Sequence, residues 1–152
     1  DPVEMVRESA RILRNGGLLA IAVPNFGSMQ SRLFRRNWFH LDLPRHICHF
    51  TPGTLTGILG RFGFTVVSST TLSAEQNIFG FVQSALNTIA PRTPNRFYSL
   101  LKKTAGKASP AAFIGWAALA ACTLPFAAAE YVVSGIAGRG ASLILYSRKQ
   151  NV

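Results

Sequence analysis

Residues 18–25 read LLAIAVPN, and residues 38–50 read WFHLDLPRHICHF. The first stretch is apolar as far as its proline, which predicts a central parallel strand covered on both faces. The second stretch is a loop rich in His, Asp, Arg and Trp, and it follows soon after the carboxyl end of that strand. Because α/β sheets bind ligands beyond the carboxyl ends of their strands, the two stretches together predict a functional site.

The pattern around these stretches predicts part of an α/β sheet, and 152 residues are long enough for one domain with a hydrophobic core. Apolar residues at helical spacing precede the strand, and Asn15-Gly16-Gly17 ends that helix. A short helix from Ser28 to Arg36 is expected next. Further predicted elements are a helix from Thr51 to Phe62, a strand at 64–72, helices at 76–90 and 95–104, an apolar segment at 110–137 and a strand at 141–147.

This arrangement resembles the class I S-adenosylmethionine-dependent methyltransferases. The run RILRNGG at residues 11–17, with the strand that ends at Pro24-Asn25, is similar to the approach to the fifth strand of that family. The Trp-x-x-Leu-Asp-x-Pro-Arg-His-x-x-His-Phe-Thr run at residues 38–51 is similar to one branch of its small-molecule enzymes. The strands at 64–72 and 141–147 look like the sixth and the seventh.

The resemblance implies the C-terminal half of a Rossmann-like methyltransferase sheet, strands five to seven, with the last strand antiparallel. Residues 1–72 and 139–152 would form this partial methyltransferase domain. Residues 73–138 would be a helical, apolar insertion between the last two strands.

One part of the family pattern is missing from this sequence. The family binds its cofactor through a glycine-rich loop after the first strand and an acidic residue at the end of the second, and Gly138-x-Gly140 here precedes a strand instead of following one. Such a loop permits close backbone approach to the cofactor. We therefore expect S-adenosylmethionine to be bound mainly by a preceding half, this chain alone to be inactive, and its sheet to have an uncovered edge.

His46 and His49 are the candidate catalytic residues. The implied reaction is an in-line displacement, in which an enzyme mainly positions the nucleophile. A hydroxyl acceptor would benefit from a general base, and histidine suits neutral pH. The alternative for each is a structural histidine held by hydrogen bonds inside the loop, which is also the expectation for His40 unless it is exposed.

The expected substrate-binding residues are Pro24, Asn25, Trp38, Asp42 and Arg45. The first two end the strand, where the alternative is a strand stop with an Asx turn. Arg45 would bind a carboxylate or phosphate of the substrate, or else brace the loop by an ion pair with Asp42. Trp38 would be a pocket wall or a core residue.

A metal site is not expected. Asp42, His46, Cys48 and His49 are all ligand types, but their spacing matches no zinc pattern. The chain has only two cysteines, Cys48 and Cys122, which lie far apart. A disulfide framework is therefore not expected, and a reducing, cytoplasmic location fits better.

Residues 111–129 carry no charge and are long enough for one membrane crossing. If the flanking strands share a sheet, the chain must leave and return on the same side, which excludes a single crossing. A hairpin broken at Pro125 would have arms too short to span a bilayer. Three alternatives remain: a membrane-interface contact, a partner subunit, or a buried helical pair that covers the sheet.

We favour the membrane contact among these alternatives. The net charge of +10 suits an anionic partner, and the basic residues that would face headgroups are Arg92, Arg96, Lys102, Lys103 and Lys107. An anionic membrane surface could then be bound through residues 92–137, with the protein peripheral at the membrane. The basic residues form no block and no nucleic-acid-binding motif is present, so nucleic acid is not favoured.

The function expected from the resemblance is methyl transfer from S-adenosylmethionine to a small-molecule or lipid-linked acceptor. The alternative is a non-catalytic, membrane-associated or subunit-binding module that lacks the cofactor site. A homo-oligomer is left open by the sequence.

Overall fold

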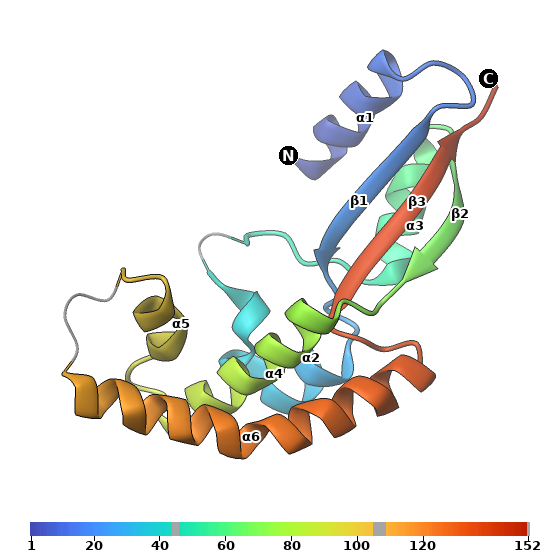
Figure 1. Ribbon diagram of the computed structural model, residues 1–152. Coiled ribbons are helices and arrows are strands. Elements are labelled where there is room, and N and C mark those ends of the chain that lie inside the picture. The colour runs from blue at the N-terminus through green and yellow to red at the C-terminus, as the bar shows by residue number, and fades with distance from the viewer. Residues whose placement is uncertain (44–45, 105–108, 152) are drawn as a thin grey trace.

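The structure is a computed structural model and describes residues 1–43, 46–104 and 109–151. Its sheet contains β1 (Leu18–Pro24), β2 (Phe64–Thr70) and β3 (Ser142–Lys149), in the order β1-β3-β2 (Figure 1). β3 is antiparallel to both neighbours, so β1 and β2 run in the same direction. The expected α/β fold and its antiparallel last strand are confirmed.

The expectation that the first strand is central, parallel and covered on both faces is wrong for the described sheet. β1 pairs only with β3, from Leu18 opposite Arg148 to Pro24 opposite Ser142. Its side chains alternate between exposed and partly buried. An apolar run alone does not show whether one face of a strand or both faces are covered. Here the two small apolar residues Ala20 and Ala22 lie on the exposed face.

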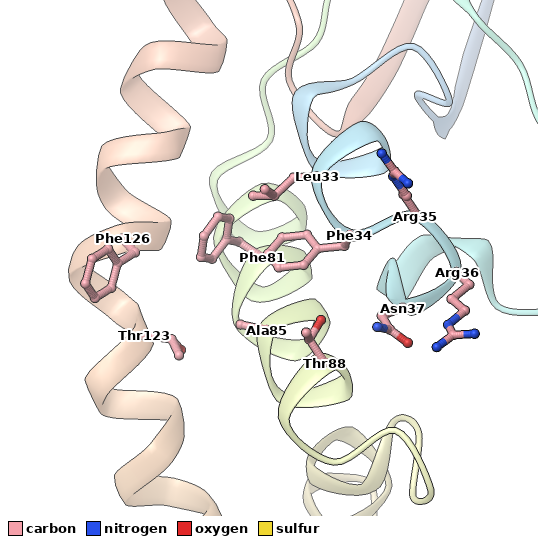
Figure 2. A pocket seen from close by; sticks show the side chains of 10 residues that line it. All are labelled: Leu33, Phe34, Arg35, Arg36, Asn37, Phe81, Ala85, Thr88, Thr123 and Phe126. Atoms are coloured by element: carbon pink, nitrogen blue, oxygen red, sulfur yellow. The ribbon is translucent and has the colours of Figure 1, made fainter.

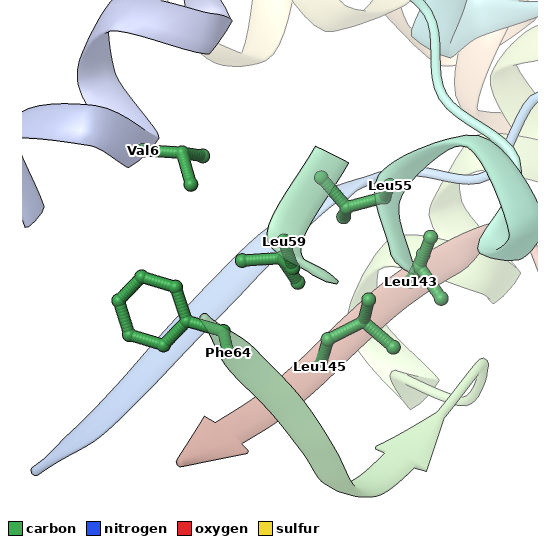
Figure 3. Packing of buried hydrophobic residues seen from close by; sticks show 6 residues of the cluster. All are labelled: Val6, Leu55, Leu59, Phe64, Leu143 and Leu145. Atoms are coloured by element: carbon green, nitrogen blue, oxygen red, sulfur yellow. The ribbon is translucent and has the colours of Figure 1, made fainter. Parts of the chain in front are cut away.

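One face of the sheet carries the first hydrophobic core. Helices α1 (Pro2–Ile12) and α3 (Pro52–Arg61) supply side chains to it. The α3 helix begins with a capping box between Thr51 and Thr54, which satisfies two backbone N–H groups at its first turn. Figure 3 shows the six buried residues of this core: Val6, Leu55, Leu59, Phe64, Leu143 and Leu145.

The opposite face and both edges of the sheet are open in the described chain. Ala20 and Ala22 of β1 are exposed, and Tyr146 of β3 is 45% exposed. The outer edge of β1 has no partner strand among the described residues. The outer edge of β2 likewise has none among these residues. Open edges present unpaired backbone donors and acceptors.

A second core forms below the carboxyl end of β1. It lies among α2 (Met29–Phe34), α4 (Ala74–Ile89), α5 (Arg96–Leu101) and α6 (Pro110–Ile136). Its buried residues are Phe81, Val82, Leu86, Phe97, Ala120 and Ala127. Figure 1 shows α6 as the long helix that runs below α4, away from the sheet.

The hairpin and the buried helical pair considered for residues 111–137 do not occur. α6 is one continuous helix of 27 residues that passes through Pro125. A proline removes one intrahelical hydrogen bond, but it does not end a helix whose neighbouring turns are held by packing. Here Ala120 and Ala127, on either side of the proline, are buried against the rest of the second core.

A buried polar contact joins three of these helices. Gln30 of α2 donates from Nε2 to Oε2 of Glu130 on α6 at 2.7 Å and to the backbone oxygen of Asn77 on α4 at 2.8 Å. Gln30 and Asn77 are fully buried, and Glu130 is 9% exposed. Because a buried polar group must keep its partner, this contact sets how α6 lies on α2 and α4.

Candidate functional site

The loop that follows β1 turns back over the second core. After α2 come two short 3-10 helices, η1 (Arg35–Asn37) and η2 (Phe39–Leu41). Asp42 then adopts a left-handed backbone, with φ of 30°, which redirects the chain. Phe50 returns to β1 and forms a parallel bridge with Asn25. The loop is therefore fixed at both ends.

Two cavities adjoin this loop. The helix-side cavity, as we name it, has a volume of about 420 Å³ and lies between the loop, α4 and α5. Its lining comprises Phe39, His40, Asp42, His46, Glu75, Gln76, Phe79, Tyr98, Leu101 and Lys102. The strand-side cavity, of about 340 Å³, is lined by Ala22, Val23, Pro24, His40, His46, Ser73, Gln76, Ser142, Leu143 and Ile144.

The two cavities share His40, His46 and Gln76, so these residues stand between the loop and the carboxyl end of β1. The position agrees with the expectation that ligands bind where such a strand ends. It also makes His46 the only one of the two candidate catalytic histidines, among the described residues, that lines both spaces.

His46 is partly buried, and its Nδ1 lies 3.2 Å from the backbone oxygen of His40. A carbonyl oxygen only accepts hydrogen bonds, so this contact selects the tautomer with a proton on Nδ1. The Nε2 lone pair is then available for a proton. This is the arrangement that a histidine needs in order to act as a general base.

His49 is held differently. Its Nε2 lies 3.2 Å from the backbone oxygen of Leu41, and its ring lies 5.4 Å from that of Phe26. It is not part of the lining of either cavity. These contacts are those of the structural alternative, in which the histidine braces the loop.

His40 is 6% exposed and more deeply buried than its two neighbours in the loop. Its Nε2 lies 3.1 Å from the backbone oxygen of Gln76, and its ring packs edge-on against Trp38. Burial lowers the pKa of His40, with a smaller opposing effect from the hydrogen bond to Gln76. A neutral His40 therefore positions the loop, as expected of a structural histidine.

The residues at the end of β1 divide into one that faces a cavity and one that does not. Pro24 lines the strand-side cavity. Asn25 is 1% exposed, donates from Nδ2 to the backbone oxygen of Gly140 and accepts from the Gly27 N–H in an Asx turn. Its side chain therefore ties β1 to the segment before β3, as in the strand-stop alternative, and its role in substrate binding stays a prediction.

The remaining candidates are placed as follows. Trp38 is 2% exposed and packs behind His40, and its indole N–H has no acceptor among the described residues. Asp42 lines the helix-side cavity. Arg45 lies outside the described residues, so its role as an anion ligand stays a prediction.

Sequence reasoning missed the α4 and α5 side of the site. Glu75, Gln76 and Tyr98 line the helix-side cavity, although they belong to the segment that was expected to be a separate insertion. Phe39, Phe79 and Tyr98 form a cluster of aromatic rings at centroid distances of 5.2–6.0 Å. No local pattern marks these residues, because only the packing of α4 on η2 brings them to the loop.

Neither β1 nor β2 of the described chain is followed by the glycine-rich turn of the family pattern. β1 continues into Asn25 and Phe26, and β2 into Thr71 and Leu72, so neither strand leads into a glycine-rich turn. No group of three or more potential metal ligands occurs in the part of the chain that the structure describes. Cys48 and Cys122 are both free and exposed.

Comparison with known proteins gave a family match for the first part of the chain. Residues 1–69 match the protein family described as a methyltransferase domain. This match confirms the resemblance found in the sequence, because it extends from single motifs to α1, β1, the loop, α3 and most of β2. Residues 1–69 are therefore similar to a methyltransferase domain.

Two solved structures resemble the chain as a whole. A protein assigned as a sarcosine dimethylglycine methyltransferase from Galdieria sulphuraria is 16% identical, with a TM-score of 0.45. The cyclase SpnF is 18% identical, with a TM-score of 0.47. The similarity covers 99% of this chain but only 48% and 45% of those proteins, so this chain spans about half their length.

These identities and TM-scores are too low for either structure to indicate what this chain does. A comparison with curated proteins gave no match.

Proposed function

We propose that this chain is the acceptor-binding, C-terminal part of a class I methyltransferase that uses S-adenosylmethionine. The acceptor would be a small molecule or a lipid-linked molecule, bound in the helix-side cavity. The observation that carries this proposal is the position of His46, between the two cavities and at the carboxyl end of β1, within the segment that matches a methyltransferase domain.

In the proposed enzyme the cofactor supplies an electrophilic methyl group, and the residues of this chain manage the acceptor and its proton. Nε2 of His46 accepts the proton of the acceptor hydroxyl or amine, since Nδ1 is already directed at the His40 oxygen. Asp42, Gln76 and Tyr98 orient the acceptor in the cavity. Arg45 is proposed to add an anion contact.

The open edge and open face of the sheet support a larger domain. β1 has no second partner strand among the described residues. The open face of the sheet exposes Ala20, Ala22 and Tyr146, which are side chains that helices could pack against. A preceding half would add a strand to β1, cover this face and contribute the glycine-rich cofactor loop. Strands β1, β2 and β3 are then the fifth, sixth and seventh of the complete sheet.

The experiment uses the complete gene product and S-adenosylmethionine with a tritiated methyl group. The enzyme is incubated with a cell extract, and the label is followed into the aqueous and the organic phase, which distinguishes a water-soluble from a lipid-linked acceptor. We expect label in one phase, and we expect His46→Gln to lower the rate by roughly 100-fold because it removes the base.

His49→Gln is the matched control, since it makes the same change in a loop histidine outside both cavities. It should lower the rate by less than about tenfold, through a looser loop. Equal losses in the two variants would contradict the role of His46. Label transfer that His46→Gln leaves unchanged would do so as well.

The alternative is a non-catalytic module, which the absence of a glycine-rich turn after a strand favours in this sequence. Calorimetric titration of the complete gene product with S-adenosylhomocysteine separates the two functions. Binding supports the enzyme, and no binding supports the module.

A further inference from the structure

The outward side of α6 is an exposed apolar surface of unusual length. Its large exposed side chains are Phe113, Ile114, Leu119, Leu124, Phe126, Val132, Val133 and Ile136. Ile114 is 65%, Phe126 68% and Ile136 86% exposed. Soluble monomers rarely expose a contiguous apolar patch of more than a few hundred Å², so a surface of this kind marks an interaction site.

The only carboxylate of α6, which has no Lys, Arg or His, faces inward. Glu130 is 9% exposed and accepts a hydrogen bond from Gln30, whereas the outward positions of the helix carry no charge. In the most apolar 18-residue window of α6, 11% of the residues are buried. The helix is therefore neither buried like a core helix nor polar on its exposed side like a helix that faces water.

A groove runs beside α6 and connects its apolar face to a basic edge. The groove has a volume of about 820 Å³, with Phe81, Ala85 and Thr88 of α4 as its floor. Figure 2 shows Phe126 on one side, Leu33 and Phe34 on the other, and the guanidinium groups of Arg35 and Arg36 beyond Phe34. Leu33 is 62% exposed, so both sides of the groove offer apolar side chains to a partner.

The basic edge has no acidic partner among the described residues. Arg32, Arg35 and Arg36 fall within five positions and are exposed. The ion pairs of the described chain join Arg7 to Glu4 and Arg11 to Glu8, both on α1 and remote from the groove. An uncompensated basic edge beside an apolar face is complementary to anionic headgroups above acyl chains.

We propose that the outward face of α6 and the adjoining groove dock on an anionic lipid bilayer, with α6 lying in the plane of the interface. Phe126 and Leu33 enter the acyl boundary, and Arg35 and Arg36 bind headgroup phosphates. α6 packs along α4 and both its ends lead into the same body, so the helix lies on the membrane and does not cross it. A second copy fits less well, because it would oppose one basic edge to another.

The test is sedimentation of the complete protein with vesicles of phosphatidylcholine containing about 30% phosphatidylglycerol, against vesicles of phosphatidylcholine alone. We expect binding to the anionic vesicles and at least about tenfold weaker binding to the neutral ones. Arg35→Gln/Arg36→Gln should weaken anionic-vesicle binding by about 30-fold, at roughly 1 kcal/mol for each basic residue. Phe126→Ser should weaken it by at least about tenfold.

The matched control variants remove the same number of charges, or one exposed apolar side chain, from surfaces away from the groove. Arg14→Gln/Arg61→Gln removes the same two charges from exposed positions on the α1 and α3 side, and Met5→Ser removes an apolar side chain that is 56% exposed. Both should bind vesicles as the unaltered protein does. Equal effects of control and groove variants would overturn the proposed site, as would absence of vesicle binding.

Analytical ultracentrifugation without lipid tests whether a second copy of the chain binds this face instead. A dimer that Phe126→Ser dissociates, together with no vesicle binding, would assign the face to a second copy and overturn the proposal. Vesicle binding needs neither cofactor nor acceptor, so it can succeed or fail independently of the proposed methyl transfer.

Discussion

Gly140 shows how closely β3 and the end of β2 approach each other. A Cβ atom at this position would lie 2.0 Å from the backbone oxygen of Thr71 and 2.7 Å from Nδ2 of Asn77. The backbone oxygen of Gly140 also accepts the hydrogen bond from Asn25. A methyl group here would therefore disturb the junction that holds the site against the sheet.

We predict that Gly140→Ala lowers the free energy of unfolding by about 3 kcal/mol, because backbone atoms must move to admit the methyl group. Gly57→Ala on the exposed side of α3 is the control, since nothing lies within 4 Å of its added Cβ. It should raise stability by up to about 1 kcal/mol through helix propensity. Urea titration measures both, and a Gly140→Ala protein as stable as the original would refute the close approach.

His40 makes stability depend on pH. Burial holds its pKa below the ordinary value of 6.5, so the unfolded state binds the proton more readily than the folded state. Its contribution to stability is present above pH 6.5 and is lost as the pH falls from 6.5 toward the lower pKa of the folded protein.

We therefore predict that the urea midpoint falls on acidification from pH 7 to pH 5.5, and that His40→Gln is less sensitive over this range. Parallel titrations at the two pH values test this. The same slope in both proteins would show that another group is responsible.

At the scale of elements, Glu130 carries the one buried carboxyl of α6. Burial raises its pKa above the ordinary value of 4.5, an effect that the hydrogen bonds from Gln30 and Ser134 reduce but do not cancel. A raised folded pKa means that the neutral form is favoured by folding. The charged form therefore destabilises the protein as the pH rises through 4.5 and the folded pKa, and the penalty persists at pH 7.

We predict that Glu130→Gln raises the free energy of unfolding at pH 7 by roughly 1 kcal/mol, because the amide oxygen still accepts from Gln30 without a buried charge. The gain should vanish below pH 4.5, where the glutamate of the original protein is protonated. Thermal unfolding at pH 7 and pH 4 gives the comparison. A destabilised variant at pH 7 would show that the charge itself is needed for the contact.

Most elements could be predicted from the sequence because their signals are local. The apolar run of β1, the Thr51-Pro52 start of α3 and the β-branched run of β2 each indicate one element without reference to the rest of the chain. Pro125 was misleading because tertiary packing overrides its local signal. A proline is a local signal against a helix, and the packing that retains the α6 helix across it comes from α4.

The candidate site was predictable only in part. The loop and its histidines are recognisable by their position after β1, but the hydrogen bonds that distinguish His46 from His49 depend on how the chain turns at Asp42. Glu75, Gln76 and Tyr98 reach the same cavity through tertiary packing alone. Sequence patterns give residue types along the chain, whereas a cavity is defined by residues that meet across it.

At the scale of the molecule, the two hydrophobic cores have different surroundings. The core between the sheet and α1 and α3 belongs to the segment that matches a methyltransferase domain, and the helical core of α4 to α6 carries the apolar outer surface. Both cavities of the candidate site lie where these two parts meet.

The central place of β3 has a consequence for the order of folding. β3 is the last strand along the chain, yet it lies between β1 and β2, which do not pair with each other. During synthesis on the ribosome, the sheet cannot close until Ser142–Lys149 have left the exit tunnel, whereas the contacts between α4 and α6 can form earlier. Such a high contact order slows folding, and nascent β1 and β2 meanwhile expose edges that chaperones would have to protect.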